Sequence, residues 1–184
     1  MAKILILGGS NCQINAVLKS KRKGHTVIVS DYYPDAPAKA FSDHQRLTST
    51  FDAEGNIQVG RHFRIDGVTT LGTDQPVLTA ARVAHQLGLP AMIDVDTALA
   101  ATNKRIMKNM FKKLGIPTVN FEIIGEGFND DQLSRVKFPV VIKPLDSQGQ
   151  RGVYKLDTIG LIRAFLKCSL SYSREDHILV EEYY

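Results

Sequence analysis

The hydrophobic pattern at the start of the chain alternates between short unbroken runs and helical spacing. Residues 3–9 (KILILGG) and 26–30 (TVIVS) are mainly aliphatic runs, which is typical of strands buried on both faces. Residues 13–23, between them, have the spacing of a helix that ends at Gly24. This order of strand, helix and strand predicts an α/β fold with a doubly wound, Rossmann-like parallel sheet.

The pattern up to residue 101 predicts three more strands and one more helix, at residues 44–49, 66–71 and 91–95 and at residues 77–87. Residues 52–63 stay ambiguous, because Gly55 and Gly60 interrupt any helix there. Asp94 and Asp96 lie one residue apart at a predicted strand end, where two carboxylates could hold a cation. The favoured interpretation is structural, with Asp96 as the N-cap of a short following helix.

The chain changes character after residue 101, which predicts two domains at residues 1–101 and 102–184. Residues 102–114 predict a helix capped by Thr102 or Asn103, with Lys104 and Lys108 one turn apart on one face. Its expected buried face consists of Ile106, Met107, Met110, Phe111 and Leu114. The later predicted elements are strands at residues 118–124, 140–142, 153–156 and 177–180 and helices at residues 132–136 and 158–171.

Residues 138–153 (FPVVIKPLDSQGQRGV) carry the strongest candidate chemistry. Lys143 lies at the end of a buried strand, where an ammonium group needs an anionic partner. The loop that follows is polar and contains Gly149 and Gly152. A strand lysine followed by a flexible loop rich in backbone N–H groups suits a polyphosphate. The alternative is a surface hairpin with an ordinary strand-end lysine.

Three familiar nucleotide motifs do not fit the chain. A Walker loop needs its lysine after the glycines, and a protein kinase needs its glycine-rich loop before the lysine. An NAD-binding domain is suggested by the opening strand–helix–strand and by Asp31 at the end of the second strand. Residues 8–13 lack the remaining spaced glycines of that fingerprint, so Asp31 is better explained as a strand-end residue or a small-substrate contact.

The composition narrows the class of partner. The 184 residues are 43% hydrophobic and 23% charged, which indicates a globular protein. The net charge of +4 comes from dispersed lysines and arginines without interleaved aromatic residues, which favours an anionic ligand over nucleic acid. Cys12 and Cys168 are expected to be free thiols. No run is long enough for a signal peptide or a membrane span, so a cytoplasmic protein without a membrane partner is expected.

Lysine first, flexible loop second and strand third resembles the ATP-grasp superfamily. That superfamily includes the carbamoyl-phosphate synthase large chain, biotin carboxylase, formate-dependent glycinamide ribonucleotide transformylase and phosphoribosylglycinamide synthetase. SDYYPDAPAKAFSDH looks like the second-strand loop of the transformylase, and ATNKRIMKNMFKKLGIPTVNFEII is similar to the superfamily's linker helix. SQGQRG (residues 147–152) resembles its phosphate flap, and ILVEEYY resembles its adenine-binding hinge. The implied architecture is a pre-ATP-grasp domain over residues 1–101 and the first ATP-grasp lobe over residues 102–184, with the second lobe missing.

The resemblance implies an ATP site built from two lysines, the flap and the hinge. Lys104 and Lys143 would contact phosphates, and the main chain at Glu181 would read the adenine. The expected ATP-binding residues are Lys104, Lys143, Ser147, Gln148, Gly149, Gln150, Arg151, Gly152, Glu181, Glu182, Tyr183 and Tyr184. The expected substrate contacts in the first domain are Gly9, Ser10, Asp31, Thr73 and Asp74.

The implied function is that of an ATP-dependent ligase. It would activate a carboxylate or bicarbonate as an acyl phosphate for attack by a nitrogen nucleophile, using ATP and Mg²⁺. Its metal ligands and catalytic arginine are expected beyond Tyr184, so this chain is expected to be an inactive N-terminal fragment without catalytic or metal-binding residues. Its hinge strand is then expected to leave an unpaired edge at residues 178–183, which would self-associate or fray. A homo-oligomer is a further possible partner state. The alternatives are a non-catalytic nucleotide-binding or regulatory module and an NAD-dependent Rossmann protein.

Overall fold

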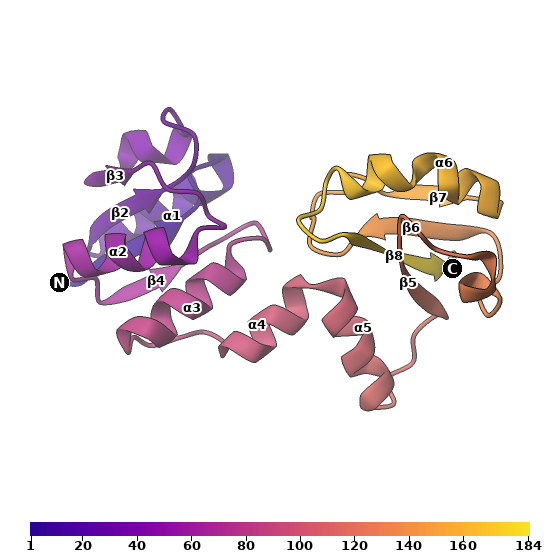
Figure 1. The fold of residues 1–184 in the computed structure, drawn as a ribbon. Helices are drawn as coiled ribbons and strands as arrows, with labels where there is room; N and C mark the ends of the chain where they lie inside the picture. Colours follow the sequence, from indigo (N-terminus) through magenta and orange to yellow (C-terminus); the bar gives the residue numbers. More distant parts are fainter. The chain divides into compact units, whose positions relative to one another are not determined.

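A computed structural model describes all residues from 1 to 184 and divides them into two compact units (Figure 1). The first unit comprises Met1–Leu99 and the second Ala100–Tyr184. The sequence-based boundary between residues 101 and 102 lies two residues further along the chain. None of the helices combines the length and the apolar character needed to cross a membrane.

The first unit is built on a parallel sheet, as the sequence predicts, and the sheet has four strands. The strands are β1 (Lys3–Leu7), β2 (Thr26–Ser30), β3 (His44–Arg46) and β4 (Gly67–Thr69), in the order β3-β2-β1-β4. β1 pairs in parallel with β2 and with β4, and β2 pairs in parallel with β3. The unit's helical elements are α1 (Asn11–Arg22), η1 (Pro37–Phe41), α2 (Ala53–Phe63) and α3 (Val77–Leu87), and α4 (Val95–Thr102) follows.

Helices cover both faces of this sheet, which explains the unbroken aliphatic runs. Leu5 and Leu7 belong to a buried cluster with Val83 of α3, whereas Ile6 lies in a second cluster with Val17 of α1. Successive residues of a strand point to opposite faces, so a strand covered on both sides needs apolar residues at every position. Both clusters are almost fully excluded from solvent.

Residues 53–63 form the regular helix α2, so the two glycines do not interrupt it. The side chain of Asp52 accepts a hydrogen bond from the Gly55 N–H at 2.8 Å and caps the helix. Gly60 is required by packing, because a Cβ there would lie 2.6 Å from Cδ1 of Leu87 on α3. Close helix packing outweighs the low helix propensity of glycine at this position.

The predicted strand at residues 91–95 is wrong, because this segment forms bends and then enters α4. The expected cap is also wrong. Asp94, not Asp96, accepts hydrogen bonds from the Thr97 N–H at 2.8 Å and the Thr97 hydroxyl at 2.7 Å. Asp96 lies in the first turn of the helix. The helix therefore begins two residues earlier than its acid pattern predicts.

The second unit is an antiparallel sheet in the order β5-β8-β6-β7. Its strands are β5 (Phe121–Gly125), β6 (Val140–Pro144), β7 (Tyr154–Leu156) and β8 (His177–Glu182). Its helical elements are α5 (Lys104–Lys113), η2 (Asp130–Leu133) and α6 (Ile159–Leu170). Ile162 and Leu166 of α6 pack on Val140, Ile142 and Val180, so α6 covers one face of the sheet.

The expected unpaired edge at residues 178–183 is wrong. β8 lies inside the sheet, with β5 on one side and β6 on the other, so its backbone groups have neighbours along both edges. The expected buried face of α5 is also only partly correct. Met110 and Leu114 are 39% and 63% exposed, whereas Lys108 is buried. A charged residue is covered at this position because it has an ionic partner inside the unit.

Candidate functional site

Lys143 and Glu181 lie on the face of the second sheet that α6 does not cover. Ile142 and Val180 point toward α6, and side chains alternate along a strand, so the next residues point the other way. The register places Glu181 of β8 opposite Val141 of β6, and Lys143 lies two residues further along β6, so its side chain points to the same face as that of Val141. The Lys143 ammonium forms an ion pair with Oε1 of Glu181. The anionic partner predicted for Lys143 is therefore supplied by Glu181 of the hinge strand.

A second lysine shares the same carboxylate. Nζ of Lys108, on α5, lies 2.7 Å from Oε2 of Glu181 and 2.7 Å from Oγ1 of Thr118. It also lies 5.6 Å from the centre of the Phe121 ring. We call Lys108, Glu181 and Lys143 the charge triad. It carries two positive charges and one negative charge, so the triad has a net positive charge.

The charge triad keeps its carboxylate ionised. Burial raises the pKa of the Glu181 carboxyl, but hydrogen bonds and charge attraction from Lys108 and Lys143 outweigh burial and hold the pKa below its ordinary value. A buried ion pair of this kind is costly to break, because the group left behind loses both water and its partner. The Glu181 carboxylate is therefore ionised at neutral pH.

Lys104 lies beside the flap, and its phosphate-binding role stays a prediction. Its backbone N–H donates to the carbonyl of Leu145 at 2.9 Å, and its ammonium donates to the carbonyl of Ser147 at 2.7 Å. Asn103 caps α5 by accepting from the Ile106 N–H, which confirms one of the two predicted caps. The fold therefore joins the beginning of α5 to the first residue of the flap.

The flap has one open glycine and one anchored glycine. Gly149 and Gly152 have φ angles of +72° and +70°, and Gln150 between them has a φ of +61°. Nothing lies within 4 Å of a Cβ added to Gly149, whereas one added to Gly152 would lie 2.9 Å from Pro144. The carbonyl of Gly152 accepts a hydrogen bond of 2.8 Å from the buried Ser169 hydroxyl. Of the two glycines, the structure leaves Gly149 free to act as a hinge and fixes Gly152.

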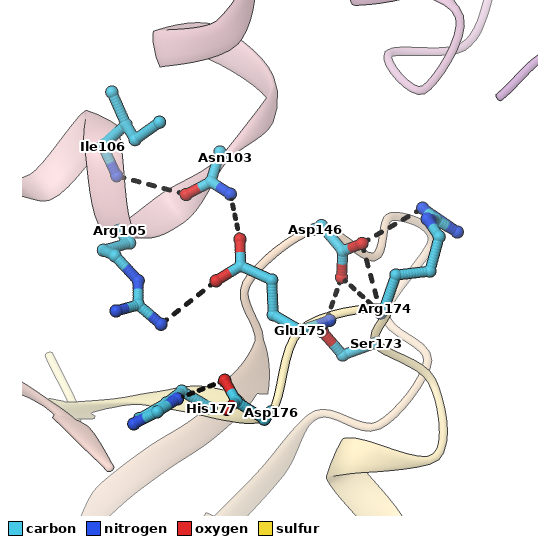
Figure 2. A network of polar contacts seen from close by, with 9 residues as sticks. All are labelled: Asn103, Arg105, Ile106, Asp146, Ser173, Arg174, Glu175, Asp176 and His177. Atoms are coloured by element: carbon cyan, nitrogen blue, oxygen red, sulfur yellow. Dashed lines mark hydrogen bonds and ion pairs between the residues drawn. The ribbon is translucent and has the colours of Figure 1, made fainter. Parts of the chain in front are cut away.

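A polar network holds the residue just before the flap and the first residues of α5 in place (Figure 2). Asp146, just before the flap, accepts hydrogen bonds from the Ser173 hydroxyl and from the Arg174 backbone. The next residue, Glu175, accepts from the Asn103 amide and pairs with Arg105 at 3.1 Å. The loop between α6 and β8 thus holds both residues that flank Lys104. Nothing in the sequence pattern of residues 173–177 indicates this role.

The hinge residues have structural partners of their own. The Glu182 carboxylate accepts hydrogen bonds of 2.9 Å from the Asn120 amide and from the Lys137 N–H. The Tyr183 ring lies 3.9 Å from Nζ of Lys155, and Tyr184 is fully exposed. Strands β5 and β6 pair with β8 on either side of Glu181. Its expected main-chain contact with adenine stays a prediction. Gln148 is half-buried, and Arg151 is exposed on the flap.

The expected substrate contacts lie at the carboxyl ends of the parallel strands of the first unit, the usual position for a ligand in such sheets. The Asp31 carboxylate accepts hydrogen bonds from the Gly9 N–H at 2.7 Å and from the Tyr33 N–H at 2.8 Å. The structure thus brings Gly9 and Asp31 together and gives the carboxylate a structural role.

The other three expected contacts lie in the loops of the same unit. Ser10 donates to the buried side chain of Gln13, which in turn donates to the Leu71 carbonyl. Thr73 and Asp74 follow in that loop, and the Asp74 carbonyl accepts from the Val77 N–H at the start of α3. Among residues 1–184, no three His, Cys, Asp or Glu side chains gather in a way that could hold a metal ion.

No protein-family model matches the chain. Among curated proteins, it is similar to the formate-dependent phosphoribosylglycinamide formyltransferase of Prochlorococcus marinus strain MIT 9515. The two are 28% identical over 155 residues, which cover 82% of this chain and 39% of that protein. The enzyme of the same name from Bacteroides thetaiotaomicron is 24% identical, and the match covers 100% of this chain and 48% of that enzyme. The chain therefore spans less than half the length of these relatives.

Solved structures of other enzymes share the fold of this chain over slightly less than half of their own length. N5-carboxyaminoimidazole ribonucleotide synthetase from Thermotoga maritima matches with a TM-score of 0.68 and 22% identity, over 100% of this chain and 46% of that one. An ADP complex of an N5-carboxyaminoimidazole ribonucleotide synthetase matches with a TM-score of 0.76 and 17% identity, over 100% and 47%. The L-amino acid ligase of Bacillus licheniformis matches with a TM-score of 0.72 and 20% identity, over 100% and 44%.

Proposed function

We propose that the intact protein is an ATP-dependent ligase and that the second unit contributes to its ATP site. The proposal starts from the fold, which is that of the N-terminal part of the ATP-grasp enzymes. The observation that carries the proposal is the arrangement around the flap. Lys143 stands beside it on β6, and Lys104 donates to its first carbonyl. Two lysines, a glycine-containing loop and a net positive charge fit a polyphosphate.

Each element of this arrangement would have a separate task in binding ATP. Lys143 and Lys104 would neutralise phosphate charge as point cations. Gly149, with open space around it, would let the flap move over the phosphates. Gln148, Gln150 and Arg151 would supply further donors. The hinge residues Glu181 to Tyr184 would lie along the adenine, with main-chain groups reading its edge.

The proposed reaction transfers the terminal phosphoryl group of ATP to a carboxylate and forms an acyl phosphate. An amine then attacks the acyl carbon and releases inorganic phosphate. The two lysines would stabilise charge on the transferred group, which is the largest contribution that a protein makes to such reactions. A closed flap would exclude water and so protect the acyl phosphate from hydrolysis.

Magnesium would supply further neutralisation of the phosphates when bound. The chain's own acids do not fit it, because no cluster of three ligating side chains occurs in residues 1–184. Asp146 and Glu182 are engaged with neighbouring residues, and Glu181 belongs to the charge triad. We therefore place the metal ligands of the proposed ligase outside this chain.

The loops of the first unit are the proposed binding site for the small-molecule substrate. Gly9, Ser10 and Asp31 lie after β1 and β2, and Thr73 and Asp74 lie after β4. The relatives' name makes formate and phosphoribosylglycinamide the first carboxylate and amine to test. A cytoplasmic location and a homo-oligomeric state are further proposals, and neither nucleic acid nor a membrane is a proposed partner.

The test is carboxylate-dependent release of ADP by the intact protein. ATP and Mg²⁺ would be supplied with formate, bicarbonate or a larger carboxylate, and hydroxylamine would trap any acyl phosphate as a hydroxamate. The proposal predicts ADP release that requires one of these carboxylates, and hydroxamate formation when that carboxylate is formate or larger. Tight ATP binding without carboxylate-dependent ADP release would contradict it and favour the alternative of a non-catalytic nucleotide-binding module.

A further inference from the structure

The charge triad contains one lysine more than its carboxylate needs. Glu181 is 13% exposed and already has a partner in Lys143, yet Lys108 lies 2.7 Å from its other oxygen. Burying an additional ammonium group costs free energy, which its ion pair and hydrogen bonds have to offset. If Lys143 never left Glu181, the burial of Lys108 would add a desolvation cost without giving Glu181 a partner that it lacks.

We propose that Lys108 is a positioning residue that remains on Glu181 while Lys143 turns from Glu181 to the phosphates of a bound nucleotide. This inference rests on the proposed ATP-binding function. In the nucleotide-free protein both lysines share the carboxylate. When Lys143 engages a phosphate, Lys108 alone keeps Glu181 ionised and paired, so the exchange of partners does not leave a buried charge behind.

The two lysines differ in the way that this exchange requires. The Lys108 side chain is 9% exposed and is also held by the Thr118 hydroxyl at 2.7 Å and by the ring of Phe121. Lys143 is 24% exposed and lies near the end of β6, three residues before Asp146 of the network that anchors the flap. Lys143 can therefore reorient toward the flap, and Lys108 is fixed.

Removing Lys108 would couple nucleotide binding to protonation. The charges that face Glu181 are Lys108 from α5 and Lys143 from β6, and its neighbour on β5 is the uncharged Phe121. Without Lys108, the departure of Lys143 would leave a buried carboxylate unpaired. Such a group takes up a proton rather than stay charged. Binding of ATP would then be accompanied by proton uptake and would weaken as the pH rises.

Calorimetry of ATP binding to the intact protein tests this coupling. Binding would be measured in buffers of different ionisation enthalpy, which report the number of protons taken up, and at several pH values from 5.5 to 8. The variants are Lys108→Met, Lys108→Arg and the double variant Lys108→Met/Glu181→Gln. Lys113→Met, an exposed lysine of the same helix, is the matched control.

The expected results separate this inference from the proposed function. Lys108→Met should bind ATP roughly ten- to hundredfold more weakly, the effect of a lost charge-assisted contact, and should take up close to one proton more than the unmodified protein. Lys108→Arg and Lys113→Met should behave like the unmodified protein. The double variant should recover most of the affinity and lose the extra proton uptake, because no buried charge is left to compensate.

Three outcomes would overturn the inference. One is unchanged affinity and proton uptake in Lys108→Met in a protein whose Lys143→Ala variant binds ATP weakly, which would leave the proposed function intact. Another is a double variant as weak as Lys108→Met. If Lys108→Met does not fold, the ATP affinity of the double variant alone tests the inference, which predicts near-normal affinity for it. Unchanged affinity in Lys143→Ala would remove both the proposed function and the inference.

Discussion

The ammonium group of Lys104 donates a hydrogen bond of 2.7 Å to the main-chain carbonyl of Ser147, the first residue of the flap. The Lys104 backbone N–H also donates to the carbonyl of Leu145, two residues earlier. Helix α5 is therefore attached to the segment that leads into the flap by a side-chain and a main-chain contact. A phosphate group that bound the Lys104 ammonium would have to compete with the Ser147 carbonyl. The position of the flap and the binding of phosphate are therefore linked.

Replacing Lys104 by methionine should make the flap more mobile from residue 147 to residue 151. The methionine side chain follows that of lysine as far as Cε but cannot donate to Ser147, so amide hydrogens of residues 147–151 should exchange faster in the nucleotide-free protein. Hydrogen exchange followed by mass spectrometry measures this directly. Lys113→Met removes the same charge from the same helix away from the flap and should not change the exchange. Equal protection in both variants would show that the Lys104 contact does not restrain the flap.

The two flap glycines should respond differently to alanine. Gly152→Ala adds a Cβ 2.9 Å from Pro144 and 3.1 Å from the Ser169 carbonyl at a φ of +70°, so it should lower the free energy of unfolding by about 2–4 kcal/mol. Gly149→Ala meets no neighbour and carries only the backbone cost of its positive φ, about 1 kcal/mol. Urea denaturation of both variants measures the difference. Equal losses would mean that Gly152 is not an anchor.

The charge triad should contribute to stability above pH 4.5 and lose that contribution in acid. The pKa of Glu181 is held below its ordinary value of 4.5 in the folded protein, so the unfolded chain binds a proton more readily. The stabilisation is therefore complete above the unfolded pKa and is lost as the pH falls through the lower folded pKa. Glu181→Gln should flatten this acid limb in a plot of unfolding free energy against pH between 3 and 6. An acid limb as steep as that of the unmodified protein would exclude Glu181 as its source.

The sequence carries the information for local structure at many positions. Apolar runs covered by helices on both faces predict β1 and β2, and the helical period predicts α3 from Val77 to Leu87. The pairing of a strand lysine with a glycine-containing loop identifies Lys143 and the flap as a single region. These features depend on residues that are close in sequence, where periodicity and turn chemistry act directly.

The features that the sequence does not reveal depend on distant contacts. The helix through Gly60 depends on Leu87, and the position of β8 inside its sheet depends on two strands from elsewhere in the chain. Lys108 has the spacing of an exposed residue, and only the placement of Glu181 explains its burial. The ties from Glu175 to the start of α5 have no sequence signal, because a polar loop residue has no periodicity.

The central claim is that Lys143 binds the phosphates of ATP, and the dissociation constant of ATP in the Lys143→Ala variant of the intact protein tests it most directly. Lys167→Ala, whose lysine side chain is 80% exposed, provides the matched control. Calorimetry should show ATP binding weakened by ~1.5–3 kcal/mol in Lys143→Ala, roughly ten- to hundredfold, and unchanged in Lys167→Ala. Both variants should unfold as cooperatively as the unmodified protein. An unchanged dissociation constant in a folded Lys143→Ala protein would contradict the account.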